Sequence, residues 1–197
     1  MAFLTESALR RIGFAELGKN VLISEKASIY NPSRIRIGDN SRIDDFCILS
    51  AGEGGIAIGR HVHISCYVSC IGAESIVIED FVGLSGRVSV YSSTDDFSGA
   101  GLTNPTVPER YRNVRNGKVF IRKHAIVGAG AVIMPGLEIG EGAAIGALSF
   151  VAGDCKPFMM YMGTPARAIR ERSRALLNLE RDFLENQRPQ TPDPGAL

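Results

Sequence analysis

The sequence has almost no net charge and no hydrophobic run long enough to cross a membrane. Its 22 lysines and arginines nearly balance its 21 aspartates and glutamates, which leaves a formal charge of +1. This balance gives no reason to expect bulk electrostatic binding to nucleic acid or to an anionic membrane. No apolar stretch approaches the roughly 18 residues of a membrane-spanning helix, and none follows Arg10 and Arg11 as a secretory signal requires. We therefore expect no nucleic-acid or membrane partner and a cytoplasmic location.

Cysteine is also scarce, and its spacing excludes the common zinc motifs. The cysteines are Cys47, Cys66, Cys70 and Cys155. These spacings match no zinc ribbon or finger, and they contain no C-x-x-C pair. We expect the four residues to be small hydrophobic members of a tightly packed core.

What the sequence does contain is an apolar repeat with a period of six. Through the back half of the chain, an aliphatic residue returns at every sixth position: Ile121, Val127, Ile133, Ile139, Ile145 and Val151. A helix face needs apolar spacings of three and four, and a half-buried strand needs a spacing of two. A short strand followed by a turn fits a period of six, which is the hexapeptide signature of a β-helix.

The same period runs through the front half of the chain in sets of three residues, and each set corresponds to one triangular coil. The sets are Ile23, Ile29 and Ile35; Ile37, Ile43 and Leu49; Ile58, Ile64 and Cys70; and Ile78, Leu84 and Val90. One coil cannot bury its apolar edge, but stacked coils bury a continuous column and pair their backbones. Each buried aliphatic side chain contributes roughly 1.5–3 kcal/mol. The repeat therefore predicts an all-β solenoid over residues 21–163.

The repeat breaks once, in a loop excursion over residues 98–120. Long loops inside a regular scaffold are usually functional or disordered. We expect an ordered loop that reaches over a site, because Val107 and Tyr111 give it side chains to pack with. The excursion also carries four basic residues: Arg110, Arg112, Arg115 and Lys118.

Helical segments are expected on both sides of the coils. Residues 1–20 have helix-like apolar spacing and form an N-terminal helical segment. Thr164 is a good N-cap, and Pro165 suits the first helical position. These two residues predict a C-terminal helix over 164–187, and the Pro-rich residues 188–197 are expected to be a disordered tail.

Two motifs, together with the coils, carry a family resemblance. They are Gly128-Ala129-Gly130-Ala131-Val132-Ile133 and Gly163-Thr164-Pro165-Ala166-Arg167. Over roughly residues 20 to 170, the chain resembles the left-handed parallel β-helix, hexapeptide-repeat acyltransferases. The resemblance implies a homotrimer with active sites in the clefts between neighbouring subunits. It also implies an acyl-CoA, most simply acetyl-CoA, lying along the coils.

The chain departs from this family at one catalytic position. Many members carry a histidine in an Asp-His-Pro segment just before the loop, but here Asp96 and Phe97 stand in place of the histidine and the proline. A histidine is a fitting general base for a sugar hydroxyl. A deprotonated amine attacks a thioester readily, and a carboxylate can orient the amine and accept its proton. The departure therefore favours an amine acceptor.

A narrower group shares three further segments: Val82–Gly86, Tyr91–Asp96 and Thr103–Pro105. They are similar to the N-acyltransferases of nucleotide-linked 4-amino-4,6-dideoxy sugars of the viosamine and anthrose type. The similarity implies an aspartate as base and a serine nearby, which map to Asp95 or Asp96 and to Ser85. The choice between the two aspartates stays open, because side chains alternate along a strand and only one points into a cleft.

The same family implies the residues that contact CoA. Small residues let the pantetheine arm approach closely, and this places contacts at Ala129 and Ala147. Basic residues hold the phosphates, and the guanidinium forks of Arg167 and Arg170 suit that role. The expected function is transfer of an acyl group from CoA to the amine of a sugar such as dTDP-4-amino-4,6-dideoxyglucose. The product would feed surface-polysaccharide synthesis.

Alternatives to these assignments concern the catalytic base, a metal site and the function of the chain. His124 is a reserve candidate for the base, although the family places its position at a corner that faces solvent. His61 and His63 would share one strand face, and together with a third histidine from another coil they could bind zinc as in the γ-class carbonic anhydrases. The chain lacks the His-x-x-x-x-His spacing of those enzymes, so we predict no metal. The other functions are a sugar or small-molecule O-acetyltransferase of the same fold and a non-catalytic β-helix that binds a partner.

Overall fold

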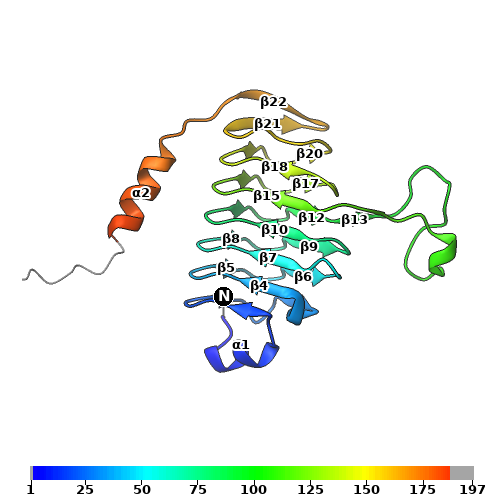
Figure 1. Cartoon of the computed structure of the whole chain (residues 1–197), viewed down its shortest axis with the longest axis horizontal. Helices are drawn as coiled ribbons and strands as arrows, with labels where there is room; N and C mark the ends of the chain where they lie inside the picture. The colour runs from blue at the N-terminus through cyan, green and yellow to red at the C-terminus, as the bar shows by residue number, and fades with distance from the viewer. Residues whose placement is uncertain (1, 187–197) are drawn as a thin grey trace, which may run out of the picture.

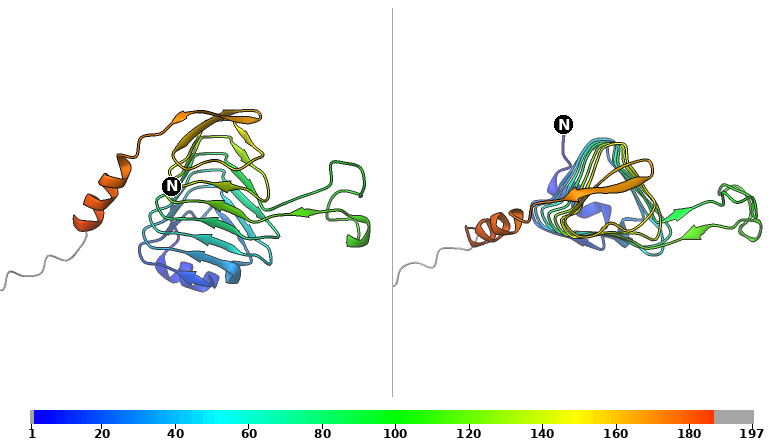
Figure 2. Two further views of the ribbon diagram at one scale, coloured as in Figure 1. Left: turned by 45° about the horizontal axis from the view of Figure 1, so that its top comes forward. Right: turned by 90° about the horizontal axis from the view of Figure 1, so that it is seen from above.

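The computed structural model describes residues 2–186 and shows a triangular solenoid (Figures 1 and 2). Three large sheets form its sides, and the chain visits them in turn along successive coils. Viewed along the solenoid in Figure 2, the stacked coils superimpose as a triangle. The predicted β-helix of hexapeptide repeats is confirmed.

The sheets consist of very short strands in parallel register. The first sheet contains β1 (Glu16–Leu17), β4 (Ile35–Ile37), β7 (Ile56–Ile58), β10 (Ile76–Ile78), β15 (Val119–Ile121) and β18 (Glu138–Ile139). The second contains β2 (Leu22–Ile23), β5 (Arg42–Ile43), β8 (His63–Ile64), β11 (Gly83–Leu84), β16 (Ile126–Val127), β19 (Ala144–Ile145), β21 (Met159–Gly163) and β22 (Ala166–Glu171). The third contains β3 (Ser28–Tyr30), β6 (Ile48–Ala51), β9 (Ser69–Gly72), β12 (Ser89–Tyr91), β17 (Val132–Ile133) and β20 (Phe150–Val151).

The six-residue repeat is the inward column of these coils. Ile121, Ile133 and Ile139 are fully buried, and Ile58, Ile78 and Ile121 are aligned on neighbouring strands of the first sheet. Stacked aliphatic side chains therefore hold the coils together through dispersion contacts and burial. This packing fixes the position of every corner between the sheets.

We name the three corners after what they carry. The helix corner, between the first and second sheets, comprises residues 59–62, 79–82 and 122–125 and lies beside helix α2 (Leu176–Asn186). The alanine corner, between the second and third sheets, comprises residues 65–68, 85–88, 128–131 and 146–149. The excursion corner, between the third and first sheets, carries the loop excursion. Figure 2 shows the excursion and α2 projecting from different corners.

The excursion is ordered and begins earlier than the predicted residue 98. β13 (Ser93–Thr94) pairs antiparallel with β14 (Arg115–Asn116), and the 3-10 helix η2 (Glu109–Tyr111) lies between them. The excursion also ends before residue 120, because Val119 is fully buried in β15 and pairs with Ile76. The solenoid therefore resumes as soon as this inward-facing valine can join the column.

The N-terminal segment contains one short helix, α1 (Glu6–Ile12), followed by strand β1. The side chain of Thr5 caps α1 by accepting a hydrogen bond from the amide of Ala8. Gly13 ends the helix with a φ of 84°, a left-handed conformation that glycine adopts without steric cost. A second 3-10 helix, η1 (Pro32–Arg34), precedes β4.

The prediction of a helix from residue 164 is wrong. Residues Ala166–Glu171 form β22, which turns back and pairs antiparallel with β21. The physical reason is that β21 would otherwise present an unpaired sheet edge at the end of the solenoid, and β22 covers it. The helix begins only at Leu176, while residue 187 and the predicted tail 188–197 lie outside the described residues. Neither described α-helix is long and apolar enough to span a bilayer.

Candidate active site

A cleft of about 870 Å³ lies where the excursion meets the outer face of the third sheet. The residues that line it from the sheet and its continuations are Ile71, Tyr91, Met134 and Phe150. The residues that line it from the excursion are Ser93, Thr94, Asp95, Phe97, Pro105, Arg112 and Val114. The cleft is mostly apolar with a few charged groups, which is the usual composition of a small-molecule site.

The two adjacent aspartates have different environments. Asp95 is half-buried and lines the cleft, and its carboxylate accepts no hydrogen bond and forms no ion pair with any residue of the range 2–186. Asp96 is only 7% exposed and does not line the cleft. The ambiguity left by the sequence is therefore reduced, because Asp95 is the carboxylate that faces the open space.

Asp96 instead folds the start of the excursion. Its Oδ1 accepts hydrogen bonds from the hydroxyl of Ser98 at 2.7 Å and from the Ser98 amide at 3.2 Å, and its Oδ2 accepts one from the amide of Gly101 at 3.0 Å. These bonds, led by the one from the Ser98 hydroxyl, lower the pKa of Asp96 to about 2. Asp96 is thus a fixed anion that fastens residues 96–101 in the turn that follows Asp95.

Ser85 lies at a different corner from Asp95. It follows β11 at the alanine corner, where its amide donates a hydrogen bond to the carbonyl of Val127 at 2.9 Å. Strand β12 then carries the chain across the third sheet before Asp95 is reached. One chain therefore does not bring the two predicted catalytic residues into one cleft.

The predicted CoA-contact alanines share the corner of Ser85. Ala129 and Ala147 are both exposed, and the amide of Leu148 donates a hydrogen bond to the carbonyl of Ala129 at 2.8 Å. Coils approach so closely here that a Cβ atom on Gly128 would lie 2.5 Å from the amide nitrogen of Ala147. The alanine corner therefore has tightly stacked coils with small exposed side chains at Ala129 and Ala147, next to the large exposed Leu148.

The two predicted phosphate-binding arginines lie on strand β22, not at a helix N-terminus. The turn before β22 is anchored to the alanine corner, because the hydroxyl of Thr164 donates a hydrogen bond to the carbonyl of Leu148 at 3.3 Å. Arg167 lines a 470 Å³ hollow close to this turn. Arg170 lies further along β22, with its Nε 3.3 Å from the sulfur of Met160. Arg167 therefore lies beside the turn that is anchored to the alanine corner, and the hollow that it lines extends to Val151–Cys155.

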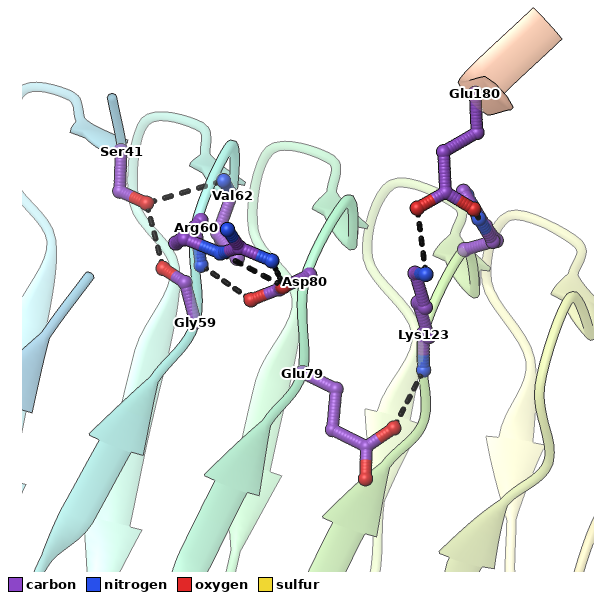
Figure 3. Close-up of polar contacts among 9 residues, drawn as sticks. Ser41, Gly59, Arg60, Val62, Glu79, Asp80, Lys123 and Glu180 are labelled. Carbon is purple, nitrogen blue, oxygen red and sulfur yellow. Dashed lines mark hydrogen bonds and ion pairs between the residues drawn. The ribbon is translucent and has the colours of Figure 1, made fainter. Parts of the chain in front are cut away.

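The reserve candidate His124 belongs to the helix corner, and the expectation that it faces solvent is wrong. It is 9% exposed because helix α2 covers it. Its Nε2 lies 2.9 Å from Oε2 of Glu180. The other carboxylate oxygen, Oε1, forms an ion pair with Nζ of Lys123 at 2.5 Å. Figure 3 shows Glu180 reaching from the helix toward Lys123, which also binds Glu79 through its backbone amide. His124 does not line the cleft of Asp95.

The other two histidines also have separate roles. The imidazole of His61 stacks on Phe81 with ring centroids 5.0 Å apart, whereas Nε2 of His63 lies 2.9 Å from the carboxylate of Asp44. Within residues 2–186, the structure contains no group of three or more His, Cys, Asp or Glu side chains placed to hold a metal ion.

The chain is similar in sequence and in structure to known acyltransferases. No family model matches the chain, but it is 50% identical over 183 residues to a dTDP-4-amino-4,6-dideoxy-D-glucose acyltransferase of Escherichia coli, covering 93% of this chain and 95% of that relative. The chain belongs to this acyltransferase family.

Solved structures of AntD, an N-acyltransferase from Bacillus cereus, are similar to this acyltransferase along almost its whole length. A complex of AntD with dTDP and 3-hydroxybutyryl-CoA has a TM-score of 0.89 at 47% identity, covering 93% of this chain and 97% of AntD. An AntD variant in complex with dTDP-4-amino-4,6-dideoxyglucose and coenzyme A has a TM-score of 0.91 at 47% identity, covering 94% and 98%. The co-substrate of this acyltransferase is an acyl-CoA.

One cleft residue of this acyltransferase was not singled out by the sequence. Arg112 was one of four basic residues in the excursion, and nothing in the pattern separated it from Arg110, Arg115 or Lys118. The structure separates them, because Arg112 is the one of the four that lines the cleft. The antiparallel pairing of β13 with β14 determines which side of the excursion faces the cleft. A pairing of two residues is too short to be predicted from hydrophobic periodicity.

Proposed function

We propose that this acyltransferase transfers an acyl group from CoA to the 4-amino group of a dTDP-linked 4-amino-4,6-dideoxyglucose. The observation that carries the proposal is the carboxylate of Asp95, which lines a mostly apolar cleft and has no side-chain partner among residues 2–186. The chain's 50% identity to an enzyme named for this sugar supports the choice of acceptor. The lining that residues 2–186 give to the cleft contains the carboxylate of Asp95 and no histidine, and in this proposal that carboxylate serves an amine, which is a better nucleophile than a hydroxyl.

In this mechanism the acceptor enters as the neutral amine, and Asp95 orients it by accepting a hydrogen bond from its N–H. The nitrogen lone pair attacks the thioester carbonyl, so the C–N bond forms and the carbonyl π electrons move to oxygen. A backbone amide stabilises this oxyanion. Asp95 takes a proton from the nitrogen, the C–S bond then breaks, and the thiolate leaves. The proton returns to the sulfur through the hydroxyl of Ser85, so the products are the amide and CoA thiol.

A second copy of the chain supplies the alanine corner in this proposal, within a homotrimer. Asp95 and Ser85 lie at different corners of one chain, so a shared site needs the corner of a neighbouring subunit. The alanine corner exposes large apolar side chains, including Leu148 at 76% and Tyr67 at 49%. Contiguous exposed apolar surface marks interaction sites. Ala129, Ala147 and Arg167 then contact the CoA along this edge, with Arg170 in a lesser role.

The acceptor is tested by measuring free-thiol release from acetyl-CoA and from 3-hydroxybutyryl-CoA. We expect turnover with dTDP-4-amino-4,6-dideoxyglucose and none with the 4-hydroxy sugar, and acetyl-CoA is expected to be the better donor. Turnover only with hydroxyl acceptors would establish the O-acyl alternative. No thiol release with any acceptor, together with dTDP binding, would favour a binding module.

The shared site is tested by mixing two variants, Asp95→Asn and Ser85→Ala, after joint unfolding and refolding. We expect about one quarter of the sites in a random mixture to combine an intact Asp95 with an intact Ser85, because each site draws one residue from each of two copies. Activity of the mixture above the sum of the separate variants supports the trimer with shared sites. No recovery, or a monomer in sedimentation, contradicts it.

The biological setting is proposed on the same grounds. An acylated nucleotide sugar is an activated donor, so the reaction that consumes the product is transfer of the sugar to a growing glycan. We place this step in surface-polysaccharide synthesis and in the cytoplasm. Cell fractionation and analysis of the polysaccharide after gene deletion test both statements.

A further inference from the structure

Arg112 is a cation with no hydrogen-bond or ion-pair partner for its guanidinium among residues 2–186. It is half-buried, and within the described residues its Nε is inaccessible to solvent yet has no hydrogen-bond partner. It forms no ion pair with any acid of residues 2–186, including Asp95 in the same cleft. A buried donor that is left unsatisfied costs about 1–3 kcal/mol, and more for a charged group. The cost is recovered when an anionic group binds.

The excursion fixes the position of this side chain. The amide of Arg112 donates a hydrogen bond to the carbonyl of Glu109 at 2.9 Å, and Arg112 pairs with Leu102 in an isolated bridge. Gly101, next to Leu102, is held in turn by the carboxylate of Asp96. The guanidinium is therefore presented from a braced loop and not from a free one, so little entropy is lost when it binds a ligand.

The chemistry of the guanidinium points to a phosphate. Its planar fork of N–H donors matches the oxygens of phosphate, and such charge-assisted bonds are the strong ones. Both proposed co-substrates contain phosphate, but their geometry differs. In the nucleotide sugar, the diphosphate and the 4-amino group lie across one sugar ring. In acyl-CoA, the whole pantetheine arm separates the phosphates from the thioester.

We propose that Arg112 anchors the diphosphate of the nucleotide sugar while Asp95 holds the amine at the other side of the ring. Within residues 2–186, the cleft thus carries one carboxylate and one guanidinium without protein partners, which match a substrate with a hydrogen-bond-donating amine and an anionic diphosphate. This inference rests on the proposed function. It adds Arg112 as the residue that binds the diphosphate of the acceptor.

The test is the affinity of Arg112→Ala for dTDP, thymidine and CoA, each measured by calorimetry. We expect the Kd for dTDP to rise about tenfold to a hundredfold, since a hydrogen bond to a charged group contributes about 1.5–3 kcal/mol. Thymidine, which lacks the diphosphate, and CoA should keep their affinities. Arg112→Lys should recover part of the loss.

The matched control is Arg110→Ala. Arg110 is exposed on the same excursion, with its guanidinium 4.8 Å from the ring centroid of Tyr111, and it does not line the cleft. It should leave all three affinities unchanged, and thermal unfolding should show that both variants fold. A loss of CoA affinity without loss of dTDP affinity in Arg112→Ala would assign the cation to CoA and overturn the proposal, as would no change in either. Failure of the proposed function is seen separately, as no amine-dependent thiol release by the unaltered protein, whatever the affinity of Arg112→Ala for dTDP.

Discussion

The helix corner and the excursion corner both contain several charged side chains, but within residues 2–186 these are paired with one another at the helix corner and unpaired in the cleft of the excursion corner. At the helix corner, Glu180 is only 12% exposed in its side chain and is paired with both Lys123 and His124. At the excursion corner, Asp95 and Arg112 line one cleft and pair with nothing among the described residues. The first arrangement holds a helix in place, whereas the second leaves charges free for a ligand.

The difference teaches how to distinguish a structural charge from a functional one. Stacking completes the helix corner, because the ring centroid of His124 lies 5.2 Å from Phe81, and Phe183 meets Phe81 edge-on. The carboxylate of Glu180 has both of its oxygens paired there, one with Lys123 and one with His124. At the excursion corner, the hydrogen-bonded carboxylate is that of Asp96, which does not line the cleft.

The largest expected effect is the loss of catalysis in Asp95→Asn. Asparagine keeps the size of the side chain but does not accept a proton, so we expect kcat to fall about 10²–10⁴-fold. Free-thiol release measures it. Glu180→Gln, at the other corner, should keep its activity. Full activity in Asp95→Asn would remove the contrast between the corners.

A smaller loss is expected from Asp96→Ala, which acts through position. Without its carboxylate, residues 96–101 lose the bonds that brace the turn after Asp95. A misplacement of about 1 Å costs up to roughly 10²-fold in rate, so we expect kcat/KM to fall by about that much at most. Amide hydrogen exchange should show Ser98 and Gly101 becoming less protected. Unchanged exchange together with reduced activity would instead place Asp96 in the chemistry.

Phe183→Ala tests the aromatic contacts of the helix corner. The ring is 39% exposed and lies edge-on to His61 at 5.2 Å. Its loss should weaken the docking of α2 by about 1–2 kcal/mol through lost burial and ring contacts. Trypsin should then cleave faster at Arg174, between β22 and the helix, while thiol release stays at the original rate. Equal cleavage rates would show that the aromatic contacts do not hold the helix.

The smallest effect is expected from Glu180→Gln, and it depends on pH. Burial opposes the charged carboxylate of Glu180, but hydrogen bonds from Lys123 and His124 outweigh it and hold its pKa below the usual value. A lowered folded-state pKa contributes stability above the unfolded value of about 4.3, and that contribution is lost as the pH falls through the folded-state pKa.

At neutral pH, we therefore expect Glu180→Gln to weaken helix docking by about 1 kcal/mol. The difference from the unaltered protein should vanish in acid, where amide hydrogen exchange of helix α2 replaces tryptic cleavage as the measurement. A difference that grows as the pH falls would contradict the assigned sign.

The solenoid could be predicted from the sequence because its period is imposed by burial alone. Val119 shows what a closer reading would add. It stands two residues before Ile121, as Ile56 stands before Ile58, so the inward pair marks the start of a coil. The predicted end of the excursion at residue 120 overlooks this spacing of two residues, which places the start of the coil at Val119.

Where tertiary contacts decide, the local pattern misled. Thr164 and Pro165 form a good helix start in isolation, yet pairing with β21 draws the next residues into a strand. His124 has no local sign of burial, because the helix that covers it comes more than fifty residues later. Asp95 and Asp96 are chemically identical neighbours, and only the turn that binds Asp96 separates their roles.

The register of the first sheet has an evolutionary consequence. Ile76–Ile78 pairs in register with Val119–Ile121, as closely as with the preceding coil, although the whole excursion is inserted between them. The scaffold is therefore indifferent to the length and sequence of this insertion. We expect that the excursion can be exchanged for one of another length or sequence while the first sheet keeps its register, which would let related chains differ in this loop alone.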